Sequence, residues 1–200
     1  MSEEHLRKES EQYLKVFLIG LFILAAEIAG GLYSNSLALI GDAAHVFTDN
    51  VAIAVSLAVV VLIKRGRNES RVRTIGFWIN IILMPVVIAW IVYEAVERIG
   101  SPHHIRGEMM FAVALIGGLL NAWQLQTLSK VEKNKTHKAL SLHVVGDLLV
   151  SAGVVAASVL ILIFEENLID PATSLAIALW LLYQTGKTIR GCGHSHDHHH

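Results

Sequence analysis

The chain has 200 residues, of which 54% are hydrophobic and only 16% are charged, and its mean hydropathy is +0.53. Soluble domains carry about 25% charged residues, so this composition excludes most soluble enzymes. The net charge of −1 argues against a nucleic-acid-binding surface. The single cysteine, Cys192, excludes a disulfide framework within the chain.

Apolar stretches long enough to cross a membrane recur six times along the chain. A bilayer core about 30 Å thick needs about 20 apolar residues in a helix. The predicted spans are residues 14–33, 37–63, 75–96, 109–128, 139–164 and 168–188. The last span is the weakest because Asp170 and Pro171 lie at its start, although proline suits a first helical turn. The polar, acidic segment 1–13 does not have the pattern of a signal peptide.

Basic residues favour one side of these spans. Fourteen of the sixteen lysines and arginines flank the two termini and the second-to-third and fourth-to-fifth connections, and only Arg98 and Arg106 lie on the other side. The positive-inside rule places the fourteen in the cytoplasm. Both termini are then cytoplasmic, which requires an even number of spans. The sequence therefore predicts an all-α membrane protein, with a cytoplasmic segment (1–13), a six-helix transmembrane bundle (14–190) and a histidine-rich tail (191–200).

Ionisable residues interrupt two of the predicted spans with the same spacing. A charged side chain in the middle of a bilayer costs about 2.5–3.5 kcal/mol, so such residues usually serve a function. His45 and Asp49 are four residues apart in the second span, and His143 and Asp147 repeat this spacing in the fifth. Residues four apart lie on one face of a helix. Two such helices face to face offer two imidazoles and two carboxylates, a set that suits a tetrahedral zinc site.

The predicted depths of these four residues are compatible with one site. At about 1.5 Å per residue, Asp49 lies about 20 Å and Asp147 about 18 Å below the outer surface, with the histidines on either side of this level. A single His–Asp pair in a buried helix is more often a structural hydrogen bond, but two pairs at matching depths favour a metal. The alternative is a haem with His45 and His143 as axial ligands, against which the paired carboxylates argue.

Further polar residues accompany these four. Glu27 and Asp42 are interpreted either as accessory groups that orient a ligand or as part of a water-filled vestibule. Asn50 is a third candidate accessory residue that lines a cavity or bridges helices. For Asn121 and Gln124 we expect a role in bridging helices.

Two other patterns leave alternatives open. Gly30–Gly31 and Gly117–Gly118 are equally compatible with close helix contact and with the ordinary abundance of glycine in membrane helices. The pair His103–His104 lies on the outer side and either assists metal release or belongs to an ordinary polar loop.

These residues stand in segments that resemble the cation diffusion facilitator family, from residue 14 to residue 190. SLALIGDAAHVFTD (36–49) and KALSLHVVGDLLVSAGV (138–154) are similar to its second- and fifth-span signatures. GLYSNSLAL (31–39) is similar to its first connection, and YEAVERI (93–99) to the end of its third span.

The resemblance implies a homodimeric exporter of divalent metal in exchange for protons. It implies that His45, Asp49, His143 and Asp147 are the transport-site ligands. A set of two histidines and two aspartates implies zinc as the transported substrate, with cadmium or cobalt as alternatives.

The chain departs from the family pattern in three places. Members usually carry a cytoplasmic metal-binding domain after the sixth span, whereas this sequence ends ten residues after Arg190. The third span lacks the usual arginine and glutamate near its start, and the fourth-to-fifth connection is not histidine-rich. The tail is either an expression tag or a native segment that captures metal, and we expect the latter. Its candidate ligands are Cys192, His194, His196, His198, His199 and His200.

Burial of the predicted ligands points to a mechanism. Zinc requires deprotonated carboxylates and neutral imidazoles, so its arrival expels protons. If helix movement exposes the site to each side in turn, the result is zinc/proton antiport by a secondary transporter, not an enzyme. The rivals are a non-transporting zinc sensor or partner subunit, the haem protein and, more remotely, an intramembrane hydrolase. The expected location is the lipid of a prokaryotic plasma membrane, without a nucleic-acid partner.

Overall fold

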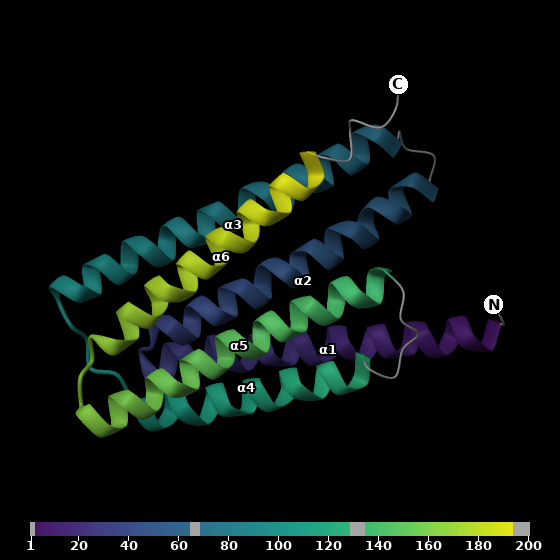
Figure 1. The fold of residues 1–200 in the computed structure, drawn as a ribbon. Helices are drawn as coiled ribbons and strands as arrows, with labels where there is room; N and C mark the ends of the chain where they lie inside the picture. The colour runs from purple at the N-terminus through teal and green to yellow at the C-terminus, as the bar shows by residue number, and fades with distance from the viewer. Residues whose placement is uncertain (1–2, 65–68, 129–134, 194–200) are drawn as a thin grey trace.

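Six α-helices make up the structure, which is a computed structural model that describes residues 3–64, 69–128 and 135–193. Side chains are described for residues 14–51, 55, 75, 78, 79, 82–127 and 144–186. The helices are α1 (Glu3–Ser34), α2 (Leu37–Lys64), α3 (Glu69–Gly100), α4 (Gly107–Leu128), α5 (Lys135–Phe164) and α6 (Ile169–Gly193). The start of α1 and the end of α6 lie at the same end of the bundle (Figure 1). We call the opposite end the distal end.

Each predicted span corresponds to one helix, so the all-α, six-helix prediction is confirmed. The main difference is at the N-terminus, where α1 begins at Glu3 and not at Leu14. The segment between them contains four glutamates together with Leu6, Arg7, Lys8 and Gln12, all of which favour the helix, so it continues the first helix. Among the described residues, three stretches are long and apolar enough to cross a membrane, at Leu14–Ser34, Gly107–Thr127 and Val144–Phe164.

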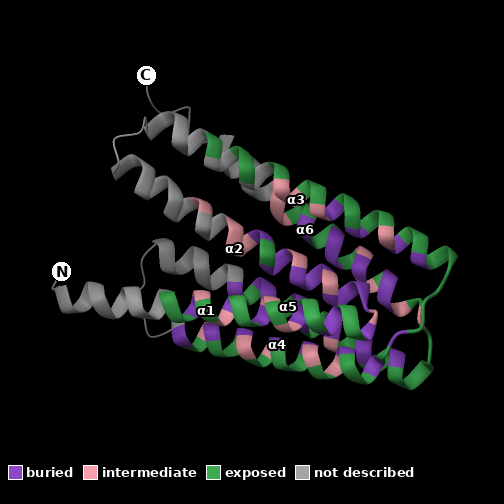
Figure 2. Cartoon of the chain, turned by 180° about the vertical axis from the view of Figure 1, so that it is seen from behind, coloured by how far each residue is buried: buried purple, intermediate pink, exposed green. Residues whose placement is uncertain are grey.

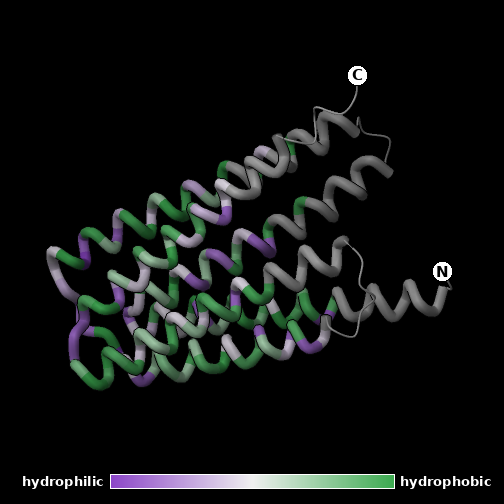
Figure 3. The backbone as a smooth tube through the Cα atoms, viewed as in Figure 1, coloured by the Kyte–Doolittle hydropathy of each residue, from purple (hydrophilic) through white to green (hydrophobic). Residues whose placement is uncertain are grey.

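The distribution of polarity is that of a membrane protein. Large apolar side chains such as Phe22, Leu119 and Ile163 are more than 60% exposed, whereas the carboxyl side chains of Glu27 and Asp42 are fully buried. Buried and exposed residues alternate along the helices (Figure 2), and hydrophobic residues occupy most of their described length (Figure 3). Exposed apolar surface on this scale is unfavourable in water and favourable in hydrocarbon. The chain is therefore a multi-pass integral membrane protein.

Helix packing places α1, α2, α4 and α5 around one centre. α4 packs against α1 and α5, while α3 packs against α2 and α6. Among the side chains that the structure describes, the larger apolar cluster includes Leu39, Ile91, Val154 and Leu181, and a smaller one contains Val16 and Val144. Toward the end with the termini, α2, α3 and α6 tilt away from α1, α4 and α5 (Figure 1).

Glycines bring α1 very close to its neighbours. A Cβ atom at Gly30 would lie 2.5 Å from Val113 Cγ2 of α4, and one at Gly31 would lie 2.6 Å from Ile40 Cγ1 of α2. A Cβ atom at Gly117 would lie 2.9 Å from Glu27 Oε1. The close-contact interpretation of the two glycine pairs is thus confirmed at these three positions.

The first turn of α2 is capped by a side chain from another helix. Asp170, in the first turn of α6, accepts hydrogen bonds from Ser36 Oγ (2.5 Å) and from the backbone N–H groups of Leu37 (2.8 Å) and Ala38 (3.2 Å). The first N–H groups of a helix have no partner within the helix, and a carboxylate there also interacts favourably with the helix dipole. Asp170 is fully buried, so this cap ties α6 to α2 at the distal end.

The C-terminal end of α1 is held by the two arginines of the distal side. Asn35 takes a left-handed conformation (φ 59°) after this helix, a position where asparagine is tolerated. Arg98 Nη1 donates to the carbonyl of Asn35 (2.7 Å), and Arg106 Nη1 donates to that of Tyr33 (3.0 Å). The Arg106 guanidinium also lies 4.7 Å from the centre of the Tyr33 ring. Arg98 and Arg106, the two basic residues on the side opposite to the other fourteen, therefore have a structural role as caps of α1.

We predict that Gly30→Ala destabilises the protein, because the added methyl group would overlap the Val113 side chain. Overpacking of this kind costs about 1–3 kcal/mol. The thermal unfolding midpoint in detergent should fall relative to wild type. Gly153→Ala is the matched control, because a Cβ atom there meets nothing within 4 Å. Equal midpoints for the two variants would contradict the close packing of α1 on α4.

We also predict that Asp170→Ala lowers the unfolding midpoint. Leu37 and Ala38 would each be left with a buried N–H group without its acceptor, at a cost of about 1–3 kcal/mol for each group. Glu97→Ala removes an exposed carboxylate from α3 and should leave the midpoint unchanged. A similar midpoint in both variants would show that the cap does not stabilise the fold.

Candidate metal centre

His45 contacts two carboxylates through its two ring nitrogens. Nδ1 lies 3.3 Å from Asp49 Oδ2, one turn later on α2, and Nε2 lies 3.1 Å from Asp147 Oδ1 on α5. The side chains of His45 and Asp147 are 5% and 10% exposed, and that of Asp49 is 24% exposed. One potential ligand atom from each residue lies within 4.8 Å of the others. The three side chains can therefore bind one ion together.

The helix directions explain why these residues meet. α2 and α5 are antiparallel neighbours. Asp147 of α5 therefore lies opposite the turn of α2 that carries His45 and Asp49. A spacing of four residues keeps His45 and Asp49 on the same face of α2. The sequence predicts that four residues bind one metal ion. The structure brings three of them, His45, Asp49 and Asp147, close together.

His143 is the fourth predicted ligand. It lies in α5, one turn before Asp147, but its side chain is outside those that the structure describes. Its place on the same face of α5 as Asp147 follows from the spacing of four residues. Its role as a ligand stays a prediction.

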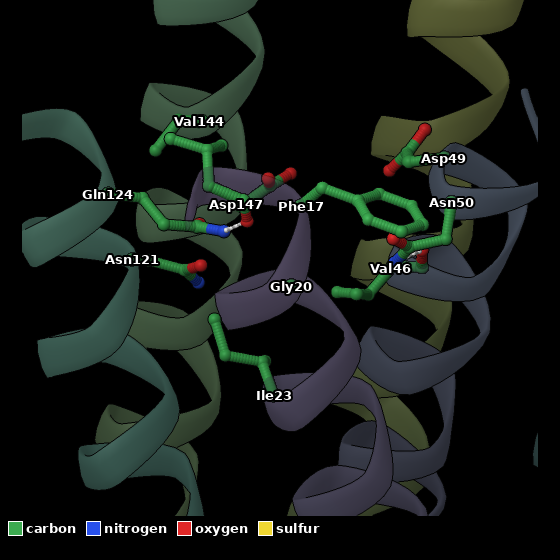
Figure 4. Close-up of a pocket in the computed structure, with 11 residues that line it drawn as sticks. Phe17, Gly20, Ile23, Val46, Asp49, Asn50, Asn121, Gln124, Val144 and Asp147 are labelled. Atoms are coloured by element: carbon green, nitrogen blue, oxygen red, sulfur yellow. Dashed lines mark hydrogen bonds between the residues drawn. The ribbon is translucent and has the colours of Figure 1, made fainter. Parts of the chain in front are cut away.

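A small cavity of about 40 Å³ lies beside the two aspartates and is lined by residues of α1, α2, α4 and α5. Asp49, Asp147, Phe17 and Gly20 are among its lining residues (Figure 4). A space of this size holds at least one water molecule. The lining includes Phe17 toward the end with the termini and Ile23 and Val46 toward the distal end, so the cavity lies at the level of the carboxylates.

The predicted bridging residues do connect helices. Gln124 Nε2 donates to the backbone carbonyl of Val16 (2.7 Å), which joins α4 to α1. Asn121 Nδ2 donates to Ser151 Oγ (3.1 Å), which joins α4 to α5. Asn50 lines the cavity, and its amide donates to the carbonyl of Val46 in its own helix (2.8 Å).

Glu27 and Asp42 lie deep in the bundle. Both are fully buried, and Asp42 Oδ2 accepts a hydrogen bond from Ser151 Oγ (3.1 Å). Full burial favours the interpretation of both as accessory groups over the vestibule. Sequence reasoning did not identify Ser151, although its place four residues after Asp147 puts it on the same face of α5.

Of the remaining candidate residues, the structure describes the side chains of His103 and His104, which lie away from this centre. His103 and His104 are exposed in the connection between α3 and α4, where the carbonyl of His104 accepts a hydrogen bond from Asn35. Cys192 lies in the last turn of α6, but its side chain is outside the described set. The tail residues His194, His196, His198, His199 and His200 lie outside the described residues altogether.

Comparison with known proteins places this centre in a family. Residues 14–194 match the family model of the cation efflux transmembrane domain. The zinc transporter ZitB of Pectobacterium atrosepticum is 36% identical over 91% of this chain and 60% of its own length. The metal cation efflux system protein CzcD of Cupriavidus metallidurans is 36% identical over 88% of this chain and 58% of its own length.

A third relative, the cadmium, cobalt and zinc/H(+)-K(+) antiporter of Bacillus subtilis, is 30% identical over 84% of this chain and 58% of its own length. The chain thus spans about three-fifths of the length of the first of these relatives and slightly less of the other two. All three relatives are bacterial, which agrees with the expected location in a prokaryotic plasma membrane. With its family model matched over most of the sequence, the chain belongs to the cation efflux family, the cation diffusion facilitators.

Proposed function

We propose that this chain moves divalent metal ions out of the cytoplasm, with zinc as the main substrate and cadmium or cobalt as alternatives. The family is one of cation efflux transporters and not of enzymes. One named relative is a zinc transporter and another is a cadmium, cobalt and zinc antiporter, which supports this range of metals. The observation that carries the proposal is the buried imidazole of His45 between carboxylates of two different helices.

The donor atoms of the centre fit zinc. Imidazole nitrogen and carboxylate oxygen are ordinary zinc ligands, and four ligands complete a tetrahedron. His45, Asp49 and Asp147 supply three, and we propose His143 as the fourth because of its spacing from Asp147. In a site this buried, the protein ligands replace the water that surrounds the ion in solution.

Exchange of metal for protons follows from the chemistry of the same groups. Metal binding requires deprotonated carboxylates and neutral imidazoles, so each metal ion displaces protons and each returning proton weakens metal binding. Because the ligands come from both α2 and α5, movement of one helix against the other changes access to them. We propose that the metal approaches this centre from the end with the termini, which the charge pattern assigns to the cytoplasm.

Two rival functions make different use of these residues. A zinc sensor or partner subunit would bind metal at the same centre without transporting it. A bis-histidine haem protein would need a ring nitrogen of His45 for the iron, but in this structure both nitrogens face carboxylates. The geometry therefore supports the metal-ion site over haem. The proposed assembly is a homodimer in the lipid of a plasma membrane.

The proposed ligand set predicts how metal binding responds to substitution. Purified wild-type protein should bind Co²⁺ with the intense visible absorption of a four-coordinate ion, and zinc should displace it. Asp49→Asn, Asp147→Asn and His143→Ala should each weaken binding by about 100-fold or more, beyond the 10–100-fold typical of losing a residue that only orients a ligand. Glu108→Gln, an exposed change in the first turn of α4, is the control. Normal binding by His143→Ala would remove His143 from the site.

The proposed transport predicts gradient-driven flux. Proteoliposomes that contain wild-type protein should move zinc when a pH gradient is imposed, and Asp147→Ala should abolish this movement because the metal loses a ligand. Zinc flux that does not depend on the gradient would contradict antiport. Tight zinc binding without any flux in wild type would instead favour the sensor or partner subunit.

A further inference from the structure

A second contact joins α2 to α5 next to the metal centre. Ser151 Oγ donates a hydrogen bond to Asp42 Oδ2 (3.1 Å). Asp42 precedes His45 by three residues on α2, and Ser151 follows Asp147 by four residues on α5. Because the two helices are antiparallel, both offsets lead about one turn toward the distal end. The Asp42–Ser151 contact therefore lies next to the His45–Asp147 contact and in the same register.

The Ser151 hydroxyl is itself held in place. It accepts a hydrogen bond from Asn121 Nδ2 of α4 (3.1 Å), so its proton is directed to Asp42. Asp42 and Ser151 are fully buried, and Asn121 is 2% exposed. Water therefore does not compete for these hydrogen bonds, and bonds to a charged acceptor in such surroundings are strong. The Asn121–Ser151–Asp42 chain links three of the four helices that surround the metal centre.

We propose that Ser151 is a positioning residue that sets the distance between α2 and α5 at the metal centre and thereby favours zinc over cadmium. This inference rests on the proposed function. Zinc takes nitrogen and oxygen ligands at about 2.0–2.2 Å, whereas the larger cadmium ion needs longer bonds. A centre whose ligands come from two helices is adapted to the smaller ion only if the helices cannot move apart. The Asp42–Ser151 contact restrains this movement one turn away from the ligands.

The test compares two buried serines of the same helix. Ser158 is also buried, but its hydroxyl donates to the carbonyl of Val155 within α5 and contacts no other helix through this bond. Zinc and cadmium affinities are measured by equilibrium dialysis of purified protein. Ser151→Ala should weaken zinc binding by about tenfold, the lower end of the range for a residue that orients a ligand. Cadmium binding should weaken less, so the zinc-to-cadmium affinity ratio should fall.

Ser158→Ala should leave this ratio unchanged, and Ser151→Thr, which keeps the hydroxyl, should restore it. A role in packing alone would lower the unfolding midpoint of Ser151→Ala without changing the ratio. If Ser151→Ala does not fold, Asn121→Ala is tested in its place. It removes the hydrogen bond that directs the Ser151 hydroxyl and should also lower the zinc-to-cadmium affinity ratio. An unchanged ratio in Ser151→Ala, or in Asn121→Ala where that variant replaces it, overturns the proposal. Absence of zinc binding in wild type would instead overturn the proposed function.

Discussion

Burial of the His45 and Asp147 side chains in an apolar bundle, with the half-buried Asp49 beside them, is the constraint on which the rest of the structure depends. Ionised groups in hydrocarbon are costly unless other charged or polar groups compensate them. Here the compensation comes from across the helix interfaces, since His45 of α2 contacts Asp147 of α5. The helices that carry these groups must therefore keep one register. The hydrogen bonds of Asn121 and Gln124 from α4 connect its neighbours around the same centre.

Side-chain hydrogen bonds close the distal end of the bundle. Asp170 caps α2 from α6, and Arg98 and Arg106 bind carbonyls at the end of α1. The small cavity lies beside Asp49 and Asp147, at the level of the metal centre. Closure of the distal end fits the proposal that the site is loaded from the end with the termini.

Much of this arrangement could be predicted from the sequence because membrane helices carry strong signals. Apolar length predicted one helix for each of the six spans, and the repeated spacing of four residues identified His45, Asp49 and Asp147. Spacing within a helix does not show which residue of another helix lies opposite. Ser151 and Asp170 were therefore missed as partners, since an isolated serine and an aspartate beside a proline carry no signal of a contact in another helix. Arg98 and Arg106 were counted only as charges for the same reason.

The hydrogen-bonded cap at the distal end also limits how the bundle can change shape in the proposed transport. Asp170 of α6 caps the start of α2. Opening the distal end by separating α6 from the start of α2 would leave buried N–H groups without partners, at a cost of about 1–3 kcal/mol each. Movement of α5 against α2 leaves the Asp170 cap in place and acts on the Asp42–Ser151 hydrogen bond and on the His45–Asp147 contact. In the proposed mechanism, a metal ion or protons at the centre therefore change how firmly α5 is held against α2.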